Sequence, residues 1–577
     1  MFTREKNAQI VMSLLKQHGI KKVVASPGNT NVAFIGSIQN DPYFEMYSAV
    51  DERSAAYMAC GLAAESEEPV VISCTGATAS RNYLPGLTEA YYRKLPVLAI
   101  TSTQDTSKVG HLVAQVIDRS SLQNDVTKVS VSMPIVKDAD DVWACEVSAN
   151  KAILELYRDG GGPAHINLFT NYNLPFDCKV LPTSRAIHRH FIDSGNLPEL
   201  KGKVAVFIGS HPKWEQKQTE ALDAFCEAND AVVFCDHTSG YKGKYRLLFS
   251  LAAGQEYMDN SALRPDISIH IGEISGDYPS LRMSGKQVWR VSRDGELRDT
   301  FRKLKHVFEM PESLFFKKYT QSNSPNNSYY LTCKDYLSSL RESMPELPYS
   351  NIWVASQLAT HLPPHSNLHL GILNSLRSWN FFEVPETVDV CSNVGGFGID
   401  GILSSLLGAS LNNESKPYFC VLGDLAFFYD MNTLGNRHVG KNLRILMINN
   451  GKGTEFKQYN HHAAYFDDAA DEYIAAANHF GNKSKTLVKN FAQDLGLQYL
   501  SASTKEEFIK AKEQFLSVEP MKQSVVFEVF TDSRLESKAL EKVLNIKQDS
   551  KLLLKGKTKK MIGHKGMSTI RKIVKGS

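Results

Sequence analysis

The chain has 577 residues, of which 42% are hydrophobic and 22% are charged, and its formal net charge is +3. This length exceeds what one hydrophobic core supports, so we expect about three or four domains of an ordinary globular protein. No run of about 18 apolar residues occurs and residues 1–6 have no apolar core, so neither a transmembrane helix nor a signal peptide is expected.

The first third of the chain alternates apolar runs with helical patterns, which predicts an α/β domain with a parallel sheet. A helix is expected over residues 52–64. Strands are expected at 22–25, 70–74, 96–101 and 164–168. A second unit opens with a strand at 203–210, and the same pattern continues at 231–235 and 267–272.

A polar linker at residues 322–328, rich in Ser and Asn, leads to a third unit. Strands are expected there near 367–372, 388–391, 418–422, 444–448 and 524–530. The predicted fold class is therefore α/β, with three doubly wound parallel-sheet domains. We place these domains at residues 1–180, 200–320 and 345–535, with a C-terminal tail at 536–577.

The positive charge is concentrated in that tail. Residues 551–577 contain nine Lys or Arg residues and no acidic residue, whereas the rest of the chain is mildly acidic. Such a tail could bind nucleic acid or another acidic partner, or an anionic membrane surface. A solvated tail, or an arm that docks on a neighbouring subunit, explains the pattern better, because no aromatic residue is present for base stacking.

The cysteines bear on the cellular compartment. They are nine in number and scattered, and none forms a Cys-x-x-Cys pair. Free buried thiols in a reducing environment explain this distribution best. We therefore predict a cytoplasmic protein.

Glu52 is the first candidate functional residue. It begins a helical segment, where a glutamate often does no more than interact with the positive end of the helix dipole. Its surroundings are more specific, because the sequence there reads Asp-Glu-Arg-Ser-Ala-Ala, followed shortly by Gly-Leu-Ala.

A second candidate site lies far along the chain, where Gly423-Asp424-Leu425 is followed by Asn449-Asn450. Apolar runs precede both segments, which places them at strand carboxyl ends, where open α/β sheets bind ligands. The Asp424 carboxylate and the Asn450 side-chain carbonyl are hard oxygen ligands of the kind that Mg²⁺ prefers. An ordinary strand, turn and helix would give the same spacing without a ligand.

Together the two segments resemble the thiamine diphosphate (ThDP) enzymes of the 2-oxo acid decarboxylase and carboligase family. In that family the second motif reads Gly-Asp-Gly, then a slightly longer spacer, then Asn-Asn, so Leu425 replaces the second glycine. The motifs are most similar to those of the menaquinone-pathway SEPHCHC synthases, which join 2-oxoglutarate to isochorismate. The resemblance implies pyrimidine-binding (PYR), central and diphosphate-binding (PP) domains for the three predicted units.

The resemblance also implies roles for individual residues. The Glu52 carboxylate would bind N1′ of the ThDP pyrimidine and favour the imino tautomer that removes the C2 proton. Asp424 and Asn450 would bind Mg²⁺, with the main-chain carbonyl of Lys452 as the third protein ligand. The family usually has glycine or another small residue at the position of Lys452.

Further cofactor contacts follow from the resemblance. In the glycine-rich segment 393–401, Ile399 matches the bulky residue beneath the two cofactor rings, although turn formation alone would explain the glycines. The other predicted cofactor-binding residues are Pro27, Gly28, Gly76, Ser375, Asn393, Gly398, Gly423, Leu425 and Ala426. Predicted substrate contacts are Asn29, Thr30, His111, Gln115 and Arg377. His461 and His462 are acid–base candidates, although most lone histidines are not catalytic.

The substrate side departs from the SEPHCHC synthases. Their Ser-Arg-Ser is Asn-Thr-Asn at residues 29–31, and two further arginines are replaced by Val394 and Trp379, although Arg377 lies nearby. Arginine binds carboxylates through two parallel hydrogen bonds, which these replacements cannot reproduce. We therefore expect the same cofactor chemistry on a different, less acidic substrate.

The implied activity is Mg²⁺- and ThDP-dependent decarboxylation of a 2-oxo acid, with transfer of the acyl carbanion to an acceptor. A carboligase (a transferase) is favoured. A simple decarboxylase (a lyase), an FAD-assisted relative and a non-catalytic scaffold remain alternatives. In this family the cofactor lies between the PYR domain of one subunit and the PP domain of another. The predicted partners are thus a small-molecule 2-oxo acid, its acceptor and a second copy of the chain, in a homodimer or homotetramer.

Overall fold

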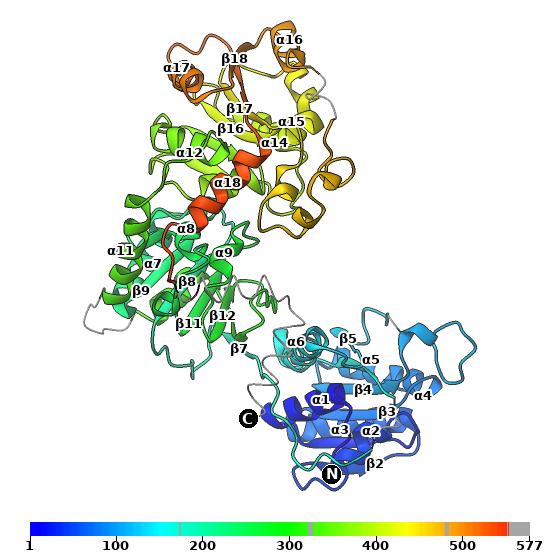
Figure 1. Cartoon of the computed structure of the whole chain (residues 1–577). Coiled ribbons are helices and arrows are strands. Elements are labelled where there is room, and N and C mark those ends of the chain that lie inside the picture. Colours follow the sequence, from blue (N-terminus) through cyan, green and yellow to red (C-terminus); the bar gives the residue numbers. More distant parts are fainter. Residues whose placement is uncertain (120, 172–174, 321–326, 479–483, 551, 553–577) are drawn as a thin grey trace. The chain divides into compact units, whose positions relative to one another are not determined.

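The computed structural model describes residues 1–552 except 120, 172–174, 321–326, 479–483 and 551. The chain forms two compact units, coloured by sequence in Figure 1. The first contains Met1–Gly195 with Asp294–Glu309, and the second contains Asn196–Arg293 with Met310–Ser577.

The first unit is built on a six-stranded parallel sheet in the order β2-β1-β3-β4-β6-β5. Its strands are β1 (Lys22–Ala25), β2 (Glu45–Ser48), β3 (Val70–Thr75), β4 (Val97–Thr103), β5 (Val129–Met133) and β6 (Ala164–Phe169). Its helices are α1 (Lys6–Gln17), α2 (Val32–Ile38), α3 (Glu52–Ser66), α4 (Thr78–Asn82), α5 (Leu84–Tyr92) and α6 (Ala139–Glu155). This unit also contains β7 (His188–Phe191) and β13 (Leu304–Glu309), which pair in parallel.

Both faces of this sheet are covered, which explains why β4 and β6 are buried at every residue. Leu14 of α1 and Ile153 of α6 contribute to the apolar core on one face. Ala56 of α3 and Leu87 of α5 contribute to the core on the other face. The approach of α3 to α5 requires a glycine, because a Cβ on Gly86 would lie 2.4 Å from that of Ala56.

The second unit contains two further parallel sheets. One has the order β10-β9-β8-β11-β12, with β8 (Val204–Ile208), β9 (Ala231–Cys235), β10 (Arg246–Leu248), β11 (Ile267–Ile271) and β12 (Gln287–Ser292). Its associated helices are α7 (Gln216–Asn229), α8 (Ser250–Ala253), α9 (Tyr278–Leu281), α10 (Glu312–Lys318) and α11 (Ser328–Glu342).

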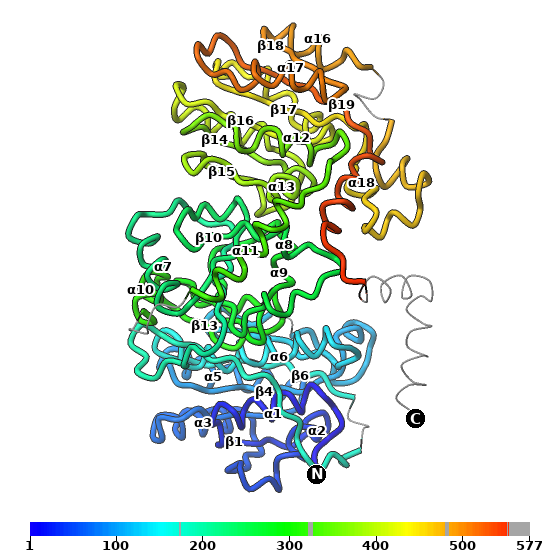
Figure 2. The backbone as a smooth tube through the Cα atoms, turned by 60° about the vertical axis from the view of Figure 1, so that its left-hand side comes forward, coloured from blue at the N-terminus to red at the C-terminus, as the bar shows by residue number. Residues whose placement is uncertain are grey.

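The other sheet has the order β15-β14-β16-β17-β19-β18, much of which can be followed in Figure 2. Its strands are β14 (Asn367–Leu370), β15 (Asp389–Cys391), β16 (Tyr418–Gly423), β17 (Leu443–Asn449), β18 (Gln498–Ala502) and β19 (Val525–Phe530). The helices are α12 (Asn351–Leu358), α13 (Asn374–Trp379), α14 (Ile402–Ser410), α15 (Asp424–Asp430), α16 (Leu487–Asp494), α17 (Lys505–Leu516) and α18 (Ser533–Leu544).

These sheets confirm the predicted α/β class with three parallel-sheet domains. One feature corrects the predicted tail: residues 536–544 belong to α18, because its periodic apolar residues, among them Leu540 and Val543, are buried. The basic residues from 553 onward lie outside the described residues, so the role of the tail stays a prediction. None of the helices in the described part of the chain is long and apolar enough to span a bilayer.

Candidate functional site

A cavity of about 200 Å³ lies at the carboxyl ends of strands in the sheet formed by β14 to β19. The segments that follow β14, β15, β16 and β17 all contribute to its lining. The structure brings together here every cofactor and metal residue predicted in the third unit. These residues are Ser375, Asn393, Gly398, Ile399, Gly423, Asp424, Leu425, Ala426, Asn450 and Lys452.

Asp424 is held in place by main-chain hydrogen bonds. The strands β16 and β17 pair in parallel, so the residues that follow them lie side by side. The amide of Gly451 donates to Asp424 Oδ2 over 2.6 Å, and the amide of Leu425 donates to Oδ1 over 2.9 Å. Gly451 adopts a φ of 78°, a conformation that favours glycine. Burial raises the pKa of Asp424 to about 7.

Asn450 supplies a second oxygen beside this carboxylate. Its side-chain Oδ1 is buried and accepts no hydrogen bond within the described part of the chain. A buried carbonyl without a donor is costly unless a ligand satisfies it. A carboxylate and an amide oxygen that line one cavity fit a hard cation such as Mg²⁺.

The preceding residue, Asn449, has a structural role. Its amide nitrogen donates to Glu528 Oε1 over 2.6 Å, and the Tyr499 hydroxyl donates to Glu528 Oε2 over 2.7 Å. These bonds connect β17, β18 and β19 beneath the cavity. They fix the end of β17, from which Asn450 extends.

Lys452, the predicted third metal ligand, has its side chain engaged elsewhere. The ammonium group forms an ion pair with Asp471, while its carbonyl accepts only a long hydrogen bond of 3.5 Å from the Thr454 hydroxyl. The lysine side chain therefore does not occupy the ligand position, and the main-chain carbonyl keeps acceptor capacity.

The glycine-rich loop 393–401 is closed onto the start of α14. Asn393 Nδ2 donates to Ser405 Oγ over 3.0 Å and to the Gly401 carbonyl over 3.3 Å. Ile399 packs against the apolar cluster beneath the sheet and also lines the cavity. The loop thus presents an apolar side chain at a fixed position on the cavity wall.

Several cavity residues were missed by the sequence reasoning. Asn351, at the start of α12, also lines the cavity, and its Nδ2 donates to Ser375 Oγ over 3.4 Å. Glu455 lines the cavity and forms an ion pair of 2.5 Å with Arg377, the predicted substrate contact. A sequence pattern could not reveal this pair, because its members lie 78 positions apart.

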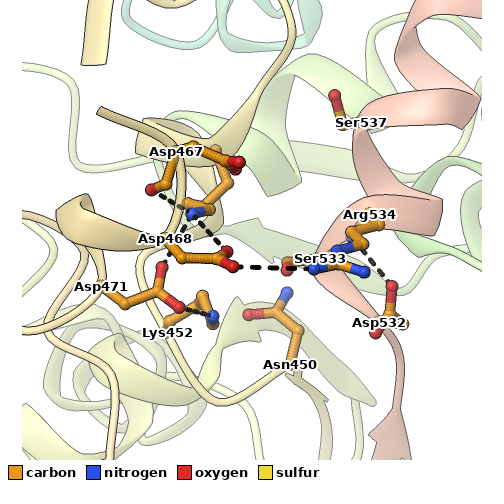
Figure 3. Close-up of a pocket in the computed structure, with 10 residues that line it drawn as sticks. Asn450, Lys452, Asp467, Asp468, Asp471, Asp532, Ser533, Arg534 and Ser537 are labelled. Carbon is orange, nitrogen blue, oxygen red and sulfur yellow. Dashed lines mark hydrogen bonds and ion pairs between the residues drawn. The ribbon is translucent and has the colours of Figure 1, made fainter. Parts of the chain in front are cut away.

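A polar cavity of about 620 Å³ adjoins the first and shares Asn450 and Lys452 with it (Figure 3). Lys457 forms ion pairs there with Asp471 over 2.8 Å and with Asp468 over 3.7 Å. Arg534 reaches Asp468 over 3.8 Å from the start of α18. Most acidic and basic side chains beside the predicted metal site therefore form ion pairs with one another.

In the first unit, Glu52 begins α3 and is half-buried. Asp51 caps the helix by accepting a hydrogen bond of 3.1 Å from the Ser54 amide. Asn82 Nδ2 donates to Glu52 Oε2 over 3.4 Å. The negative charge of Glu52 adds to the effect of burial, which raises the pKa of Cys74 to about 12 and that of Tyr83 well above its usual range.

The loop after β1 is tied to neighbouring strands. The Thr30 hydroxyl donates to the Ser102 carbonyl over 2.7 Å and is also bonded to the Thr75 hydroxyl. A Cβ on Gly28 would lie 2.5 Å from that of Thr75, so only glycine allows this approach. These contacts position Pro27, Gly28 and Asn29 at the carboxyl edge of the sheet, and they engage the Thr30 hydroxyl, a predicted substrate contact.

The remaining predicted residues are placed as follows. Gly76 directly follows β3, and a Cβ there would lie 3.1 Å from the Ser102 carbonyl oxygen. His111 and Gln115 are exposed in the loop between β4 and β5. His461 stacks on His462 at 4.3 Å, and neither lines the two cavities described above.

Arg119 is a buried residue in the first unit that no sequence signal identified. Its guanidinium donates to Thr101 Oγ1 over 2.7 Å and to the side chain of Asn167. Burial lowers its pKa to about 10. The residue anchors the end of the loop that carries Gln115.

Comparisons with known proteins agree with this picture. The family model "Thiamine pyrophosphate enzyme, N-terminal TPP binding domain" matches residues 5–127. The 2-succinyl-5-enolpyruvyl-6-hydroxy-3-cyclohexene-1-carboxylate (SEPHCHC) synthase of Bacteroides thetaiotaomicron is 30% identical, with 94% of this chain and 98% of the relative covered. The synthase of Bacteroides fragilis is also 30% identical, over 94% and 99%. That of Flavobacterium psychrophilum is 26% identical, over 92% and 97%. The chain therefore belongs to the family of thiamine diphosphate-dependent enzymes that includes these synthases.

Proposed function

We propose that this enzyme uses ThDP and Mg²⁺ to decarboxylate a 2-oxo acid and transfers the resulting acyl group to an acceptor, as a carboligase. The observation that carries the proposal is the convergence of Asp424, Asn450 and Ile399 on one cavity. The relatives are named as synthases, which favours transfer to an acceptor over simple release of an aldehyde.

The cavity has the features that a magnesium diphosphate group requires. Asp424 and the free Oδ1 of Asn450 would hold the metal, with the Lys452 carbonyl as a third ligand. A cation would offset the burial that raises the pKa of the Asp424 carboxyl to about 7. Ile399 would support the cofactor rings from the wall of the cavity.

When bound, ThDP would supply the electron sink that allows a 2-oxo acid to lose CO₂. The chain itself would bind and orient the reactants. Glu52, in the first turn of α3, would hold a proton between its carboxylate and N1′ of the cofactor.

The substrate is proposed to be less acidic than those of the SEPHCHC synthases. The positions at which the sequence comparison placed two arginines of those synthases hold Val394 and Trp379, and both side chains are buried. Arg377 is already neutralised by Glu455. None of these three residues therefore has a free guanidinium group that could bind a second carboxylate of a substrate.

Glu52→Gln is the variant that tests this function. The measurement is CO₂ release from a panel of 2-oxo acids with ThDP and Mg²⁺, with and without aldehyde acceptors. Glu65→Gln, an exposed change on the same helix, is the matched control. We expect Glu52→Gln to lower release by about two orders of magnitude or more, because general acid–base groups typically contribute that much.

The outcomes separate the alternatives. Release that depends on Glu52 and accelerates with an acceptor supports the carboligase, and release without acceleration supports a simple decarboxylase. Equal release by Glu52→Gln and the unchanged protein would contradict the assigned role of Glu52. A protein that binds ThDP but releases no CO₂ from any donor would favour the non-catalytic scaffold. A yellow purified protein would favour an FAD-assisted relative.

A further inference from the structure

A larger cavity in the second unit is not used by the proposed reaction. It has a volume of about 960 Å³, within the range typical of small-molecule sites. One wall follows the carboxyl ends of β8 and β9, and the other is formed by β14 and β15. Two sheets of one compact unit therefore enclose it.

The topology favours a ligand at this place. The strand order β10-β9-β8-β11-β12 runs outward in both directions from β8, so it reverses between β8 and β11, and the cavity lies on the β8–β9 side of this point at the carboxyl edge. Such an edge is the usual ligand site of doubly wound sheets.

His369 is the first polar group that indicates a ligand. It is only 5% exposed, yet its Nε2 has no hydrogen-bond partner within the described part of the chain. Asn367 and His369 lie two positions apart on β14, so both side chains face the same side, and both line the cavity. Burial lowers the pKa of His369 to about 4, so the ring is neutral and its Nε2 can form one hydrogen bond, as donor or acceptor according to the tautomer.

Lys242 supplies a cation to the same cavity. It is half-buried, and no ion pair of its ammonium group occurs among the described residues. Burial is the main cause that lowers its pKa, and nearby Arg246 adds to the effect. An anion beside Lys242 would offset this cost of burial.

The other charges of the lining are largely paired. Asp389 lies 3.1 Å from Lys416 and 3.7 Å from Lys213, and His211 lies 2.9 Å from Glu312. Glu386, the remaining acid of the lining, is exposed. Lys242 is thus the half-buried positive charge that remains for a ligand.

An aromatic surface completes the site. The rings of His211 and Trp214 stack at 4.3 Å, and the Trp214 Nε1 donates to the Ser239 carbonyl over 2.8 Å, which fixes the indole. Both residues line the cavity. A fixed indole beside an unpaired ammonium group suits a flat ligand that carries a negative charge.

We propose that this cavity binds a planar organic anion, with its ring against the stacked pair of His211 and Trp214, its acidic group on Lys242 and a hydrogen bond to His369. The site is separate from the predicted ThDP cavity, since the two share no lining residue.

Isothermal titration calorimetry of the full chain with 2-naphthoate tests the proposal. The neutral amide 2-naphthamide has the same shape without the charge, and inorganic phosphate has charge without the ring. The variants are Lys242→Met and Trp214→Ala, and Lys217→Met, an exposed change on α7, is the control. Thermal unfolding of each variant establishes that it is folded.

We expect saturable binding of 2-naphthoate, weakened about tenfold or more by Lys242→Met, the scale of one charge-assisted hydrogen bond. Trp214→Ala should also weaken it, whereas Lys217→Met should not. Absence of 2-naphthoate binding, equal affinity for the amide, or an unchanged affinity in folded Lys242→Met would each overturn the proposal. Tighter binding of phosphate than of 2-naphthoate would overturn the role of the ring.

Discussion

Asp424 is a buried carboxylate that no basic side chain neutralises in the described part of the chain. It is held by the main-chain amides of Leu425 and Gly451, which orient it without supplying a full positive charge. The Asn450 Oδ1 beside it is equally without a partner. The two oxygens have the electrostatic character of a cation site, and the chain itself supplies no cation to them within the described residues.

The first prediction follows from this pair. Asp424→Asn keeps the shape of the side chain but removes its charge, so it should raise the Mg²⁺ dissociation constant, measured by calorimetry with ThDP, by about 100-fold. Asp494→Asn, an exposed change in α16, is the control. If both variants bind Mg²⁺ as the unchanged protein does, Asp424 is not a ligand.

At this scale, the residues that the sequence could identify are those whose role depends on local spacing. Glu52 and Asp424 each stand at the start of a helix after a strand or loop that the pattern marks. The partners of Arg377 and Lys452 could not be predicted, because Glu455 and Asp471 are brought to them by loops without periodic pattern. The same holds for the buried guanidinium of Arg119.

Among the elements, α18 is connected to α12 by a buried carboxyl group. Glu536 accepts hydrogen bonds from the Asn351 amide over 3.0 Å and from the Thr531 hydroxyl over 2.7 Å. Burial raises its pKa from the ordinary 4.5 to about 7. Since Asn351 lines the predicted cofactor cavity, this contact supports the wall of the site.

The second prediction concerns the pH dependence of stability. Because its pKa is raised in the folded state, Glu536 contributes stability that is full below pH 4.5 and is lost as pH rises through 7. In Glu536→Gln this decrease of stability with rising pH should disappear. The decrease is at most roughly 3 kcal/mol in the free energy of unfolding. Urea unfolding of both proteins from pH 4.5 to 8 measures it, with exposed Glu541→Gln as control. Parallel pH profiles would contradict the assignment.

The strands β14 and β15 run along both ligand cavities. Asn367, His369 and Cys391 line the larger cavity, while the segments that directly follow these strands, including Ile372 and Asn393, line the smaller one. A ligand that fixes one end of these strands changes the freedom of the other. Coupling between two sites is a free energy and acts equally in both directions.

The third prediction is therefore reciprocal coupling. Saturating 2-naphthoate should change the ThDP dissociation constant by about fivefold or more, the lower end of typical allosteric effects, and ThDP should change that of 2-naphthoate by the same factor. Calorimetric titration of each ligand in the presence of the other measures both. Two independent affinities would show that the strands do not transmit the effect.

The strands that the sequence revealed include the most buried ones, such as β3 and β4, which contain long apolar runs, but also the short edge strand β15. The edge strand β2 was missed because its residues are mostly exposed, and the edge strand β5 because serines interrupt its apolar residues. The three-residue β10 is short and was also missed. The sequence reasoning followed continuous apolar runs and therefore missed strands that lack one.

For the whole molecule, length and the repeated strand–helix pattern were enough to predict three parallel-sheet domains. They were not enough to place the end of the last domain, since α18 continues into the segment that its charge made look like a tail. The likeness to SEPHCHC synthases over nearly the whole chain gives the family, but not the substrate.

The fourth prediction tests whether Glu52 and Asp424 act from different subunits. Glu52→Gln and Asp424→Asn should each be inactive alone. In a homodimer with shared sites, a hybrid of the two variants contains one doubly changed site and one unchanged site. Coexpression should therefore restore about a quarter of full activity in a random mixture, because half of the dimers are hybrids with one working site.

Different affinity tags on the two variants allow the hybrid to be isolated, and its activity should rise to about half that of the unchanged dimer. An isolated hybrid without activity would mean that both residues act within one chain, or that the two residues do not serve one site. Because each parent variant is impaired by a different residue, restored activity can arise only if the complementary halves of one site come from two copies.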